Sequence, residues 1–146
     1  MALNRPASSG GRVLLDNPEV SVSQHPQRIY VLDVYRHCSK ALIAAALKAI
    51  WASPGWRQPW GFVVVMHPGT TYDGDIRSHE VPPNDKRSVG TALVSSNQLH
   101  RMVIKSIGLA YGAVSGFHLT AHATLEEGVA AQLGYVQKAE ARKRPY

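Results

Sequence analysis

Cysteine is almost absent from this sequence, which has only Cys38 among its 146 residues. A single cysteine excludes an intramolecular disulfide framework and a cysteine-rich zinc site. Long hydrophobic runs are also missing, because the longest, at about residues 41–51, contains Lys48 and is too short to span a bilayer. The first residues, MALNRPASSGG, are polar, so we expect no secretory signal. These absences predict a cytoplasmic protein that does not insert into membranes.

Basic charge is in excess, but it is not concentrated. Sixteen Lys and Arg residues against ten Asp and Glu residues give a formal net charge of +6. The basic residues are spread along the chain and cluster only in the final segment, ARKRPY. A nucleic-acid-binding protein would interleave aromatic residues with basic ones or carry a recognisable reading helix, and neither is found. We therefore expect no nucleic-acid partner. Basic residues at this end suit the last turn of a helix, where cations interact favourably with the helix dipole.

The composition is that of a soluble globular protein, with 45% hydrophobic and 18% charged residues. The length fits one domain. We predict a flexible leader at residues 1–17, a single α/β domain at 18–141 and a basic tail at 142–146.

Hydrophobic patterning predicts strands and helices in alternation. The run GFVVVM does not alternate, which indicates a central strand covered on both faces. Asp33 lies in the middle of another predicted strand, and we interpret it as a residue of a solvated face. The predicted strands are residues 19–23, 28–36, 61–66, 92–94 and 117–121, and the predicted helices are residues 39–53, a segment that begins after Ser96, and 125–141.

Polar residues mark where these helices begin. Ser39, either Ser96 or Asn97, and Thr124 with Glu127 are the expected caps. Residues 67–89, with Pro82 and Pro83, contain no credible regular element longer than one turn, and so long a loop is more often functional than idle. Helical crossovers imply parallel pairing, so we predict an α/β fold with a mixed, mostly parallel sheet of four or five strands and helices packed on it.

The order of elements and the segments GFVVVM, TALVSS and GFHLTAHATLEEGVA resemble the STAS superfamily, in particular its SpoIIAA-like branch of small bacterial proteins. The resemblance covers about residues 20–137. It implies a non-catalytic, regulatory role in protein interaction or ligand sensing, and frequent self-association. Phosphorylated relatives carry an Asp-Ser pair at the head of a helix, and this sequence lacks that pair. Thr70, Thr71 and Ser78 are candidate phosphosites, and nothing in the sequence selects among them.

The predicted topology also defines a candidate ligand edge. Loops at the carboxyl ends of parallel strands meet at one edge of a sheet, and ligands favour that edge. A helix that begins there offers unpaired N–H groups to an anion such as a phosphate or a carboxylate. The candidate ligand-binding or partner-binding residues at this edge are His37, His67, Ser95, Ser96, Asn97 and His122.

Metal and nucleophile chemistry have weaker support. No HxH or HxxxH spacing links any two of His37, His67, His79 and His122, so we predict neither a metal site nor a cofactor. Nucleophilic catalysis would need Cys38 with His37 or His67, but His37 adjoins Cys38 and points to the opposite face of a strand. Cys38 is better explained as a small buried residue. We therefore predict that the protein is not an enzyme.

Two functions follow from these observations. The leading interpretation is a non-catalytic cytoplasmic protein-interaction or regulatory module. The alternative is a carrier or sensor of a small, partly apolar or anionic ligand bound between sheet and helices. We also predict a homo-oligomer, because Trp51, Trp56 and Trp60 cluster in the sequence and Gly108 and Gly112 would form a face open to close approach.

Overall fold

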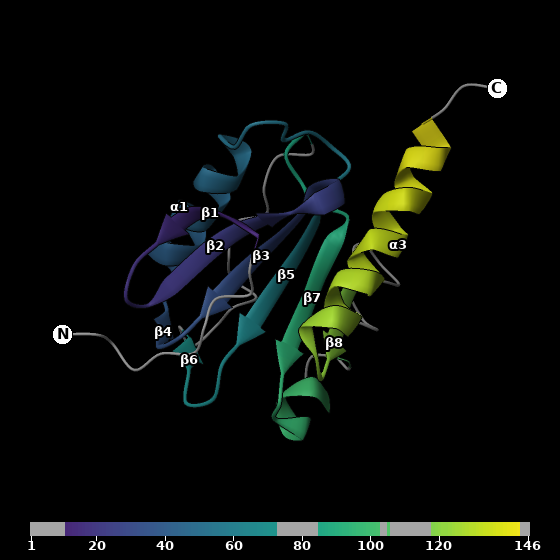
Figure 1. Cartoon of the computed structure of the whole chain (residues 1–146). Helices are drawn as coiled ribbons and strands as arrows, with labels where there is room; N and C mark the ends of the chain where they lie inside the picture. Colours follow the sequence, from purple (N-terminus) through teal and green to yellow (C-terminus); the bar gives the residue numbers. More distant parts are fainter. Residues whose placement is uncertain (1–10, 73–84, 103–104, 106–117, 144–146) are drawn as a thin grey trace.

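A computed structural model describes residues 11–72, 85–102, 105 and 118–143. Its centre is a six-stranded mixed sheet with the strand order β1-β2-β3-β5-β7-β8 (Figure 1). The first three strands in this order pair antiparallel, and the remaining pairs are parallel. The strands are β1 (Arg12–Asp16), β2 (Val20–His25), β3 (Ile29–Val34), β5 (Gly61–Met66), β7 (Gly90–Ser95) and β8 (His118–His122).

The α/β class and the mostly parallel sheet are confirmed, but the sheet has six strands where four or five were predicted. The additional strand is β1, which lies within the predicted leader. It joins the sheet because Leu14 and Leu15 pack against the core. Asn17 then closes the turn to β2, since its Oδ1 accepts hydrogen bonds from the N–H groups of Glu19 and Val20, both at 2.9 Å. Residues 1–10 lie outside the described residues.

Within the described residues, one helix packs on each face of the sheet. Helix α1 (Lys40–Trp51) lies over β1 and β2, while α3 (Leu125–Lys143) lies over β5, β7 and β8 on the opposite face (Figure 1). Arg142 and Lys143, assigned to the basic tail from the sequence, belong to α3. Residues 98–102, after β7, are helical as predicted. Among the described helices, none is both long and apolar enough to cross a membrane.

Strand alternation divides the core into two layers. The α1 layer lies between the sheet and α1, and the α3 layer lies between the sheet and α3. On β3, the α1 layer contains Tyr30, Leu32 and Val34, whereas the α3 layer contains Ile29 and Val31. Strand β5, the run GFVVVM, contributes to both layers between β3 and β7, which confirms its central position. Strands β3 and β5, which lead to the candidate site, are therefore packed on both faces.

The predicted helix caps are present. Ser39 Oγ accepts a hydrogen bond from the N–H of Leu42 at 3.1 Å, and Thr124 Oγ1 accepts one from Glu127 at 3.3 Å. At the start of the helical residues 98–102 the cap is Asn97, whose Oδ1 accepts from the N–H groups of Leu99 at 2.9 Å and His100 at 3.3 Å. These side chains satisfy backbone donors that a helix leaves unpaired.

The tryptophan cluster covers an edge of the α1 layer. Trp60 is 1% exposed, and its indole N–H donates to the carbonyl of Lys86 at 3.1 Å. Trp51 and Trp56 are partly buried against the same layer. The cluster thus has a packing role within the chain. Gly108 and Gly112 lie outside the described residues.

Candidate functional site

Parallel pairing gathers the predicted residues at the end of the sheet where β3, β5, β7 and β8 finish, which we call the carboxyl edge. Met66 of β5 pairs with Ser95, and Val94 of β7 pairs with His122, so His67, the Ser95–Asn97 turn and His122 lie along this edge. His37 instead belongs to the short strand β4 (His37–Cys38), which pairs with β6 (Thr71–Tyr72) in a separate two-stranded sheet.

Most polar groups at the carboxyl edge are already paired with one another. The side-chain oxygen of Asn97 already accepts hydrogen bonds from the first N–H groups of the helix. The backbone N–H of Asn97 donates to Ser95 Oγ at 3.1 Å. His122 Nε2 lies 2.8 Å from Thr120 Oγ1. Burial lowers the pKa of His122 below its ordinary value, while Glu127 acts to raise it and Lys105 to lower it. The lowered pKa of His122 and the cap made by Asn97 both argue against an anion at this edge, where anion binding stays a prediction.

Asp33 forms the most deeply buried polar contact of this edge. Its side chain is 0% exposed, and Oδ1 lies 2.8 Å from Nε2 of His67. The interpretation of Asp33 as a solvated residue is therefore wrong. Alternation along β3 places Asp33 on the face of Ile29 and Val31, and the parallel neighbour β5 ends beside it, so His67 reaches the carboxylate.

The imidazole of His67 is held on several sides. The ring of Tyr35 stacks on it at 5.1 Å between centroids, and the Tyr35 hydroxyl lies 2.8 Å from Ser21 Oγ. Residues 67–70 form a tight turn in which the N–H of Thr70 donates to the carbonyl of His67 at 3.2 Å. Gly69 occupies the third turn position at φ 82, as a type II turn requires. Asp33, Tyr35, Ser21 and His67 thus form one ordered polar cluster.

This cluster does not extend into a catalytic triad within the described residues. The contact with Asp33 uses Nε2 of His67, and among the described residues no hydroxyl or thiol forms a hydrogen bond with the other ring nitrogen, Nδ1. Cys38 is buried in the α1 layer, which confirms its packing role. The described residues also contain no group of three or more His, Cys, Asp or Glu side chains that could hold a metal ion.

The candidate phosphosites show no common geometry. Thr71 is exposed on β6, and its Oγ1 lies 2.8 Å from His37 Nδ1. Thr70 is partly buried in the turn after β5. Ser78 lies outside the described residues.

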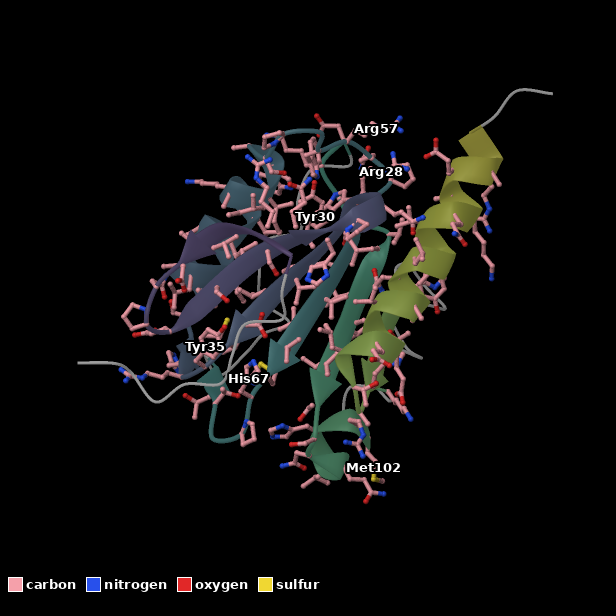
Figure 2. The ribbon with its side chains drawn as sticks, viewed as in Figure 1. Arg28, Tyr30, Tyr35, Arg57, His67 and Met102 are labelled. Atoms are coloured by element: carbon pink, nitrogen blue, oxygen red, sulfur yellow. The ribbon has the colours of Figure 1, made fainter. Side chains whose placement is uncertain are left out.

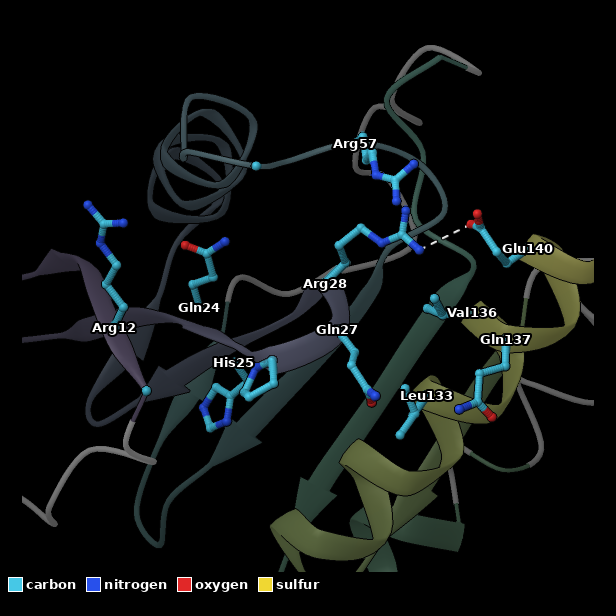
Figure 3. Close-up of a pocket in the computed structure, with 13 residues that line it drawn as sticks. Arg12, Gln24, His25, Gln27, Arg28, Arg57, Leu133, Val136, Gln137 and Glu140 are labelled. Atoms are coloured by element: carbon cyan, nitrogen blue, oxygen red, sulfur yellow. Dashed lines mark hydrogen bonds and ion pairs between the residues drawn. The ribbon is translucent and has the colours of Figure 1, made fainter. Parts of the chain in front are cut away.

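The opposite end of the sheet holds a pocket that the sequence did not predict. Figure 2 shows this separation: Arg28 and Arg57 lie at one end of the strands, and Tyr35 and His67 lie at the other. The pocket is open to solvent, has a volume of about 850 Å³, and lies between the β2–β3 connection and the C-terminal half of α3 (Figure 3). We call it the arginine pocket, after Arg12, Arg28 and Arg57, which line it together with Glu140, Leu133 and Val136.

An unusual backbone turn places Arg28 in this pocket. The connection between β2 and β3 is the short 3-10 turn η1 (Pro26–Arg28), in which Gln27 has φ 64 and Arg28 has φ 63. Neither residue is glycine, and a left-handed conformation costs an ordinary residue about 1–2 kcal/mol. Such conformations often occur at functional sites.

The hydrogen bonds of Arg28 are incomplete. Nη2 donates to Oε2 of Glu140 in α3 at 3.1 Å, across 112 positions of sequence. Nη1 is buried and has no partner within the described structure. A buried donor without a partner costs about 1–3 kcal/mol. Arg28, which lines the pocket, therefore keeps one buried donor without a partner among the described residues.

The pocket also has more positive than negative charge. Its described lining contains three arginines and one glutamate, a surplus of two positive charges with His25 counted as neutral. In the described part of the chain, neither Arg12 nor Arg57 forms a side-chain hydrogen bond or ion pair. Arg57 lies beside Arg28 (Figure 3). Glu140 pairs with Arg28, and no described carboxylate pairs with Arg57, so this pair of guanidinium groups has the chemistry to bind an anion.

No family model, no curated protein and no solved structure matches this chain. Membership of the STAS superfamily therefore stays a prediction, and the functional argument depends on the geometry of the two ends of the sheet.

Proposed function

We propose that this protein is a non-catalytic regulatory module of the cytoplasm, a carrier or sensor that binds a small anionic ligand in the arginine pocket. The observation that carries the proposal is the surplus of positive charge in the lining of the pocket, where Arg57 forms no side-chain hydrogen bond or ion pair with the described part of the chain. An anion would supply acceptors for this guanidinium group. Charge-assisted hydrogen bonds of this kind are about twice as strong as neutral ones.

The shape of the pocket supports a ligand that is partly apolar. Leu133 and Val136 of α3 form an apolar wall opposite the arginines, as Figure 3 shows. The volume of about 850 Å³ falls within the range of roughly 300–1,000 Å³ for small-molecule pockets. The ligand would lie between the sheet and a helix, as the sequence-based alternative expected.

A titration of the protein with simple anions tests this proposal. Sodium benzoate and phenyl phosphate would be added while the backbone amide signals are followed by NMR. We expect the signals of Gln27, Arg28 and Ile29 to shift, while those of Ser96 to Leu99 at the carboxyl edge stay in place. Shifts confined to the carboxyl edge, or none at millimolar concentration, would contradict the proposal.

A second candidate function is the protein-interaction module. It is favoured by Leu99 and Met102, which are 66% and 58% exposed and lie three residues apart on one side of the helical residues 98–102. Neighbouring exposed apolar side chains can form part of a contact with a partner. Replacing both with Gln should weaken capture of a protein partner and leave anion binding unchanged.

Self-association stays a prediction within this second candidate. Light scattering of the wild-type chain at rising concentration would measure it directly. A monomer mass throughout would remove the homo-oligomer from the proposal.

A further inference from the structure

The charge of the arginine pocket indicates the class of ligand. Resting on the proposed function, we infer that the ligand is an organic phosphate monoester whose dianionic phosphate binds between Arg28 and Arg57. Three observations lead to this class: the number of charges in the pocket, the donors left unused, and the apolar wall.

Charge balance favours a dianion. The described lining has three arginines against Glu140, so one carboxylate ligand would leave one positive charge unbalanced. A phosphate monoester carries about −1.5 to −2 charges at pH 7 and offers three acceptor oxygens. A phosphodiester carries a single charge and leaves the same surplus as a carboxylate. The monoester is therefore the small anion that matches the pocket most closely.

The donors come from two directions, which suits a tetrahedral group. Arg28 donates through Nη2 to Glu140 and keeps its buried Nη1 without a described partner, whereas no described side chain binds the guanidinium of Arg57. Arg28 lies on η1, and Arg57 lies in the connection between α1 and β5. A planar carboxylate matches one guanidinium fork, while the oxygens of a phosphate can accept from both arginines at once.

The pocket is larger and more apolar than a free phosphate requires. Leu133 and Val136 line the α3 side, and Gln27 and Gln137 add amide groups near the opening (Figure 3). An organic body attached to the phosphate would cover the partly exposed Leu133, and burying that apolar surface is favourable by roughly 25 cal/mol per Å². Val136 is already 3% exposed and adds little. This argument selects an organic monoester over inorganic phosphate.

Calorimetric titration of the full chain with four matched probes tests the inference. The probes are phenyl phosphate, benzoate, methyl phenyl phosphate and inorganic phosphate. The first three share a phenyl ring and differ in the charge and shape of the anionic group. We expect phenyl phosphate to bind about tenfold or more tightly than each of the others, which corresponds to about 1.4 kcal/mol or more.

Arginine substitutions locate the binding. Arg57→Gln should weaken phenyl phosphate about tenfold or more, since hydrogen bonds to charged groups contribute about 1.5–3 kcal/mol. Arg57 is exposed and makes no side-chain hydrogen bond in the described structure, so this variant should fold normally. Arg28→Gln should have a similar effect. Arg36→Gln removes the same charge from an exposed residue just beyond the carboxyl end of β3 and should leave the affinity unchanged.

The pH dependence provides an independent readout. The second ionisation of a phosphate monoester has a pKa near 6, so affinity for phenyl phosphate should rise between pH 5 and pH 7. His25 of β2 and Glu140 of α3 also line the pocket with the three arginines, and protonated His25 would favour any anion at low pH. Benzoate keeps its charge across this range. The ratio of the affinity for phenyl phosphate to that for benzoate therefore separates ionisation of the phosphate from ionisation of the protein.

The outcomes separate this inference from the proposed function. If benzoate or the diester binds as tightly as phenyl phosphate, and Arg57→Gln weakens all of them, the anion pocket stands and the monoester class is overturned. If inorganic phosphate binds as tightly as phenyl phosphate, the inference that the ligand has an organic body is overturned. If none of the four probes binds, both the proposed function and this inference fail.

Discussion

The two ends of the sheet contain similar polar residue types and use them differently. At the carboxyl edge Asp33 pairs with His67, Tyr35 pairs with Ser21, and Asn97 caps a helix. At the amino end, within the described residues, Arg28 has one ion pair and a buried donor without a partner. The comparison teaches that similar residue types can differ in how far their hydrogen-bonding groups are satisfied, and the proposed ligand site depends on that difference.

The two ends also differ in what they contribute to stability. Buried polar groups in folded proteins nearly always have partners, and the buried Asp33 and Ser95 of the carboxyl edge follow this rule. In the described structure the arginine pocket departs from it, with one unpaired buried donor and two left-handed residues that are not glycine. Each departure costs free energy of folding. A bound anion would compensate for the cost of the unpaired donor. We therefore expect that some mutations change the free energy of unfolding and others change the affinity for the anion.

The largest expected effect is at the carboxyl edge. Asp33→Ala removes the acceptor of His67 Nε2 and should lower the free energy of unfolding by about 1–3 kcal/mol. Asp33→Asn keeps an acceptor oxygen and should cost less. Urea denaturation measures both changes. Affinity for phenyl phosphate should not change in either variant, and a loss of affinity would show that the two ends are not independent.

A smaller effect is expected at the helix start. Asn97→Ala removes a cap that accepts two backbone N–H groups and should cost about 1 kcal/mol. Ser96→Ala is the matched control, because Ser96 is exposed and Asn97 makes the cap. Denaturant unfolding distinguishes the two variants. A larger loss for Ser96→Ala would contradict the assignment of the cap.

The amino end should respond in the opposite direction. Gln27 has φ 64, so Gln27→Gly should raise the free energy of unfolding by about 0.5–1 kcal/mol by relieving the left-handed strain. The same change loosens the turn before Arg28 and should weaken phenyl phosphate binding. Gln27→Ala keeps the Cβ atom and serves as the control. Unchanged stability in both variants would show that the turn stores no strain.

The smallest effect compares the two ends of β8. Burial, followed by the charges of Lys138 and Arg142, lowers the pKa of His118 at the amino end. Burial also lowers the pKa of His122 at the carboxyl edge, where Glu127 and Lys105 oppose each other. Salt screens exposed charges, so raising the ionic strength should raise the pKa of His118 more than that of His122. NMR titration of both imidazoles measures this difference.

The lowered pKa values of His118 and His122 also predict how the free energy of unfolding changes with pH. Both folded pKa values lie below the ordinary 6.5. The unfolded chain therefore takes up protons first, and stability should fall as the pH falls below 6.5. His118→Phe should flatten part of this dependence and keep an aromatic ring against Tyr135, on which His118 stacks. An unchanged pH profile of unfolding would contradict the shift.

Local patterns predicted most of the elements. The run GFVVVM became the buried strand β5, and the caps Ser39 and Thr124 begin α1 and α3. Strand β1 was missed because residues 12–16 lie next to a polar, Gly/Ser-rich segment and carry only a short apolar run. Its turn signal was present, since Asn17 followed by Pro18 is typical of a chain reversal.

The sequence by itself determined the central parallel strands, the helices between them and the edge at which His67, Ser95 and His122 meet. Those features depend on residues a few positions apart, where periodicity and capping act. Only the tertiary structure decided which polar groups are satisfied. Asp33 contacts His67, which is 34 positions away in the sequence, and Arg28 forms an ion pair with Glu140, which is 112 positions away. Hydrogen-bond capacity at a site depends on such distant partners, so the arginine pocket becomes visible only when β1, η1, the α1–β5 connection and α3 have packed together.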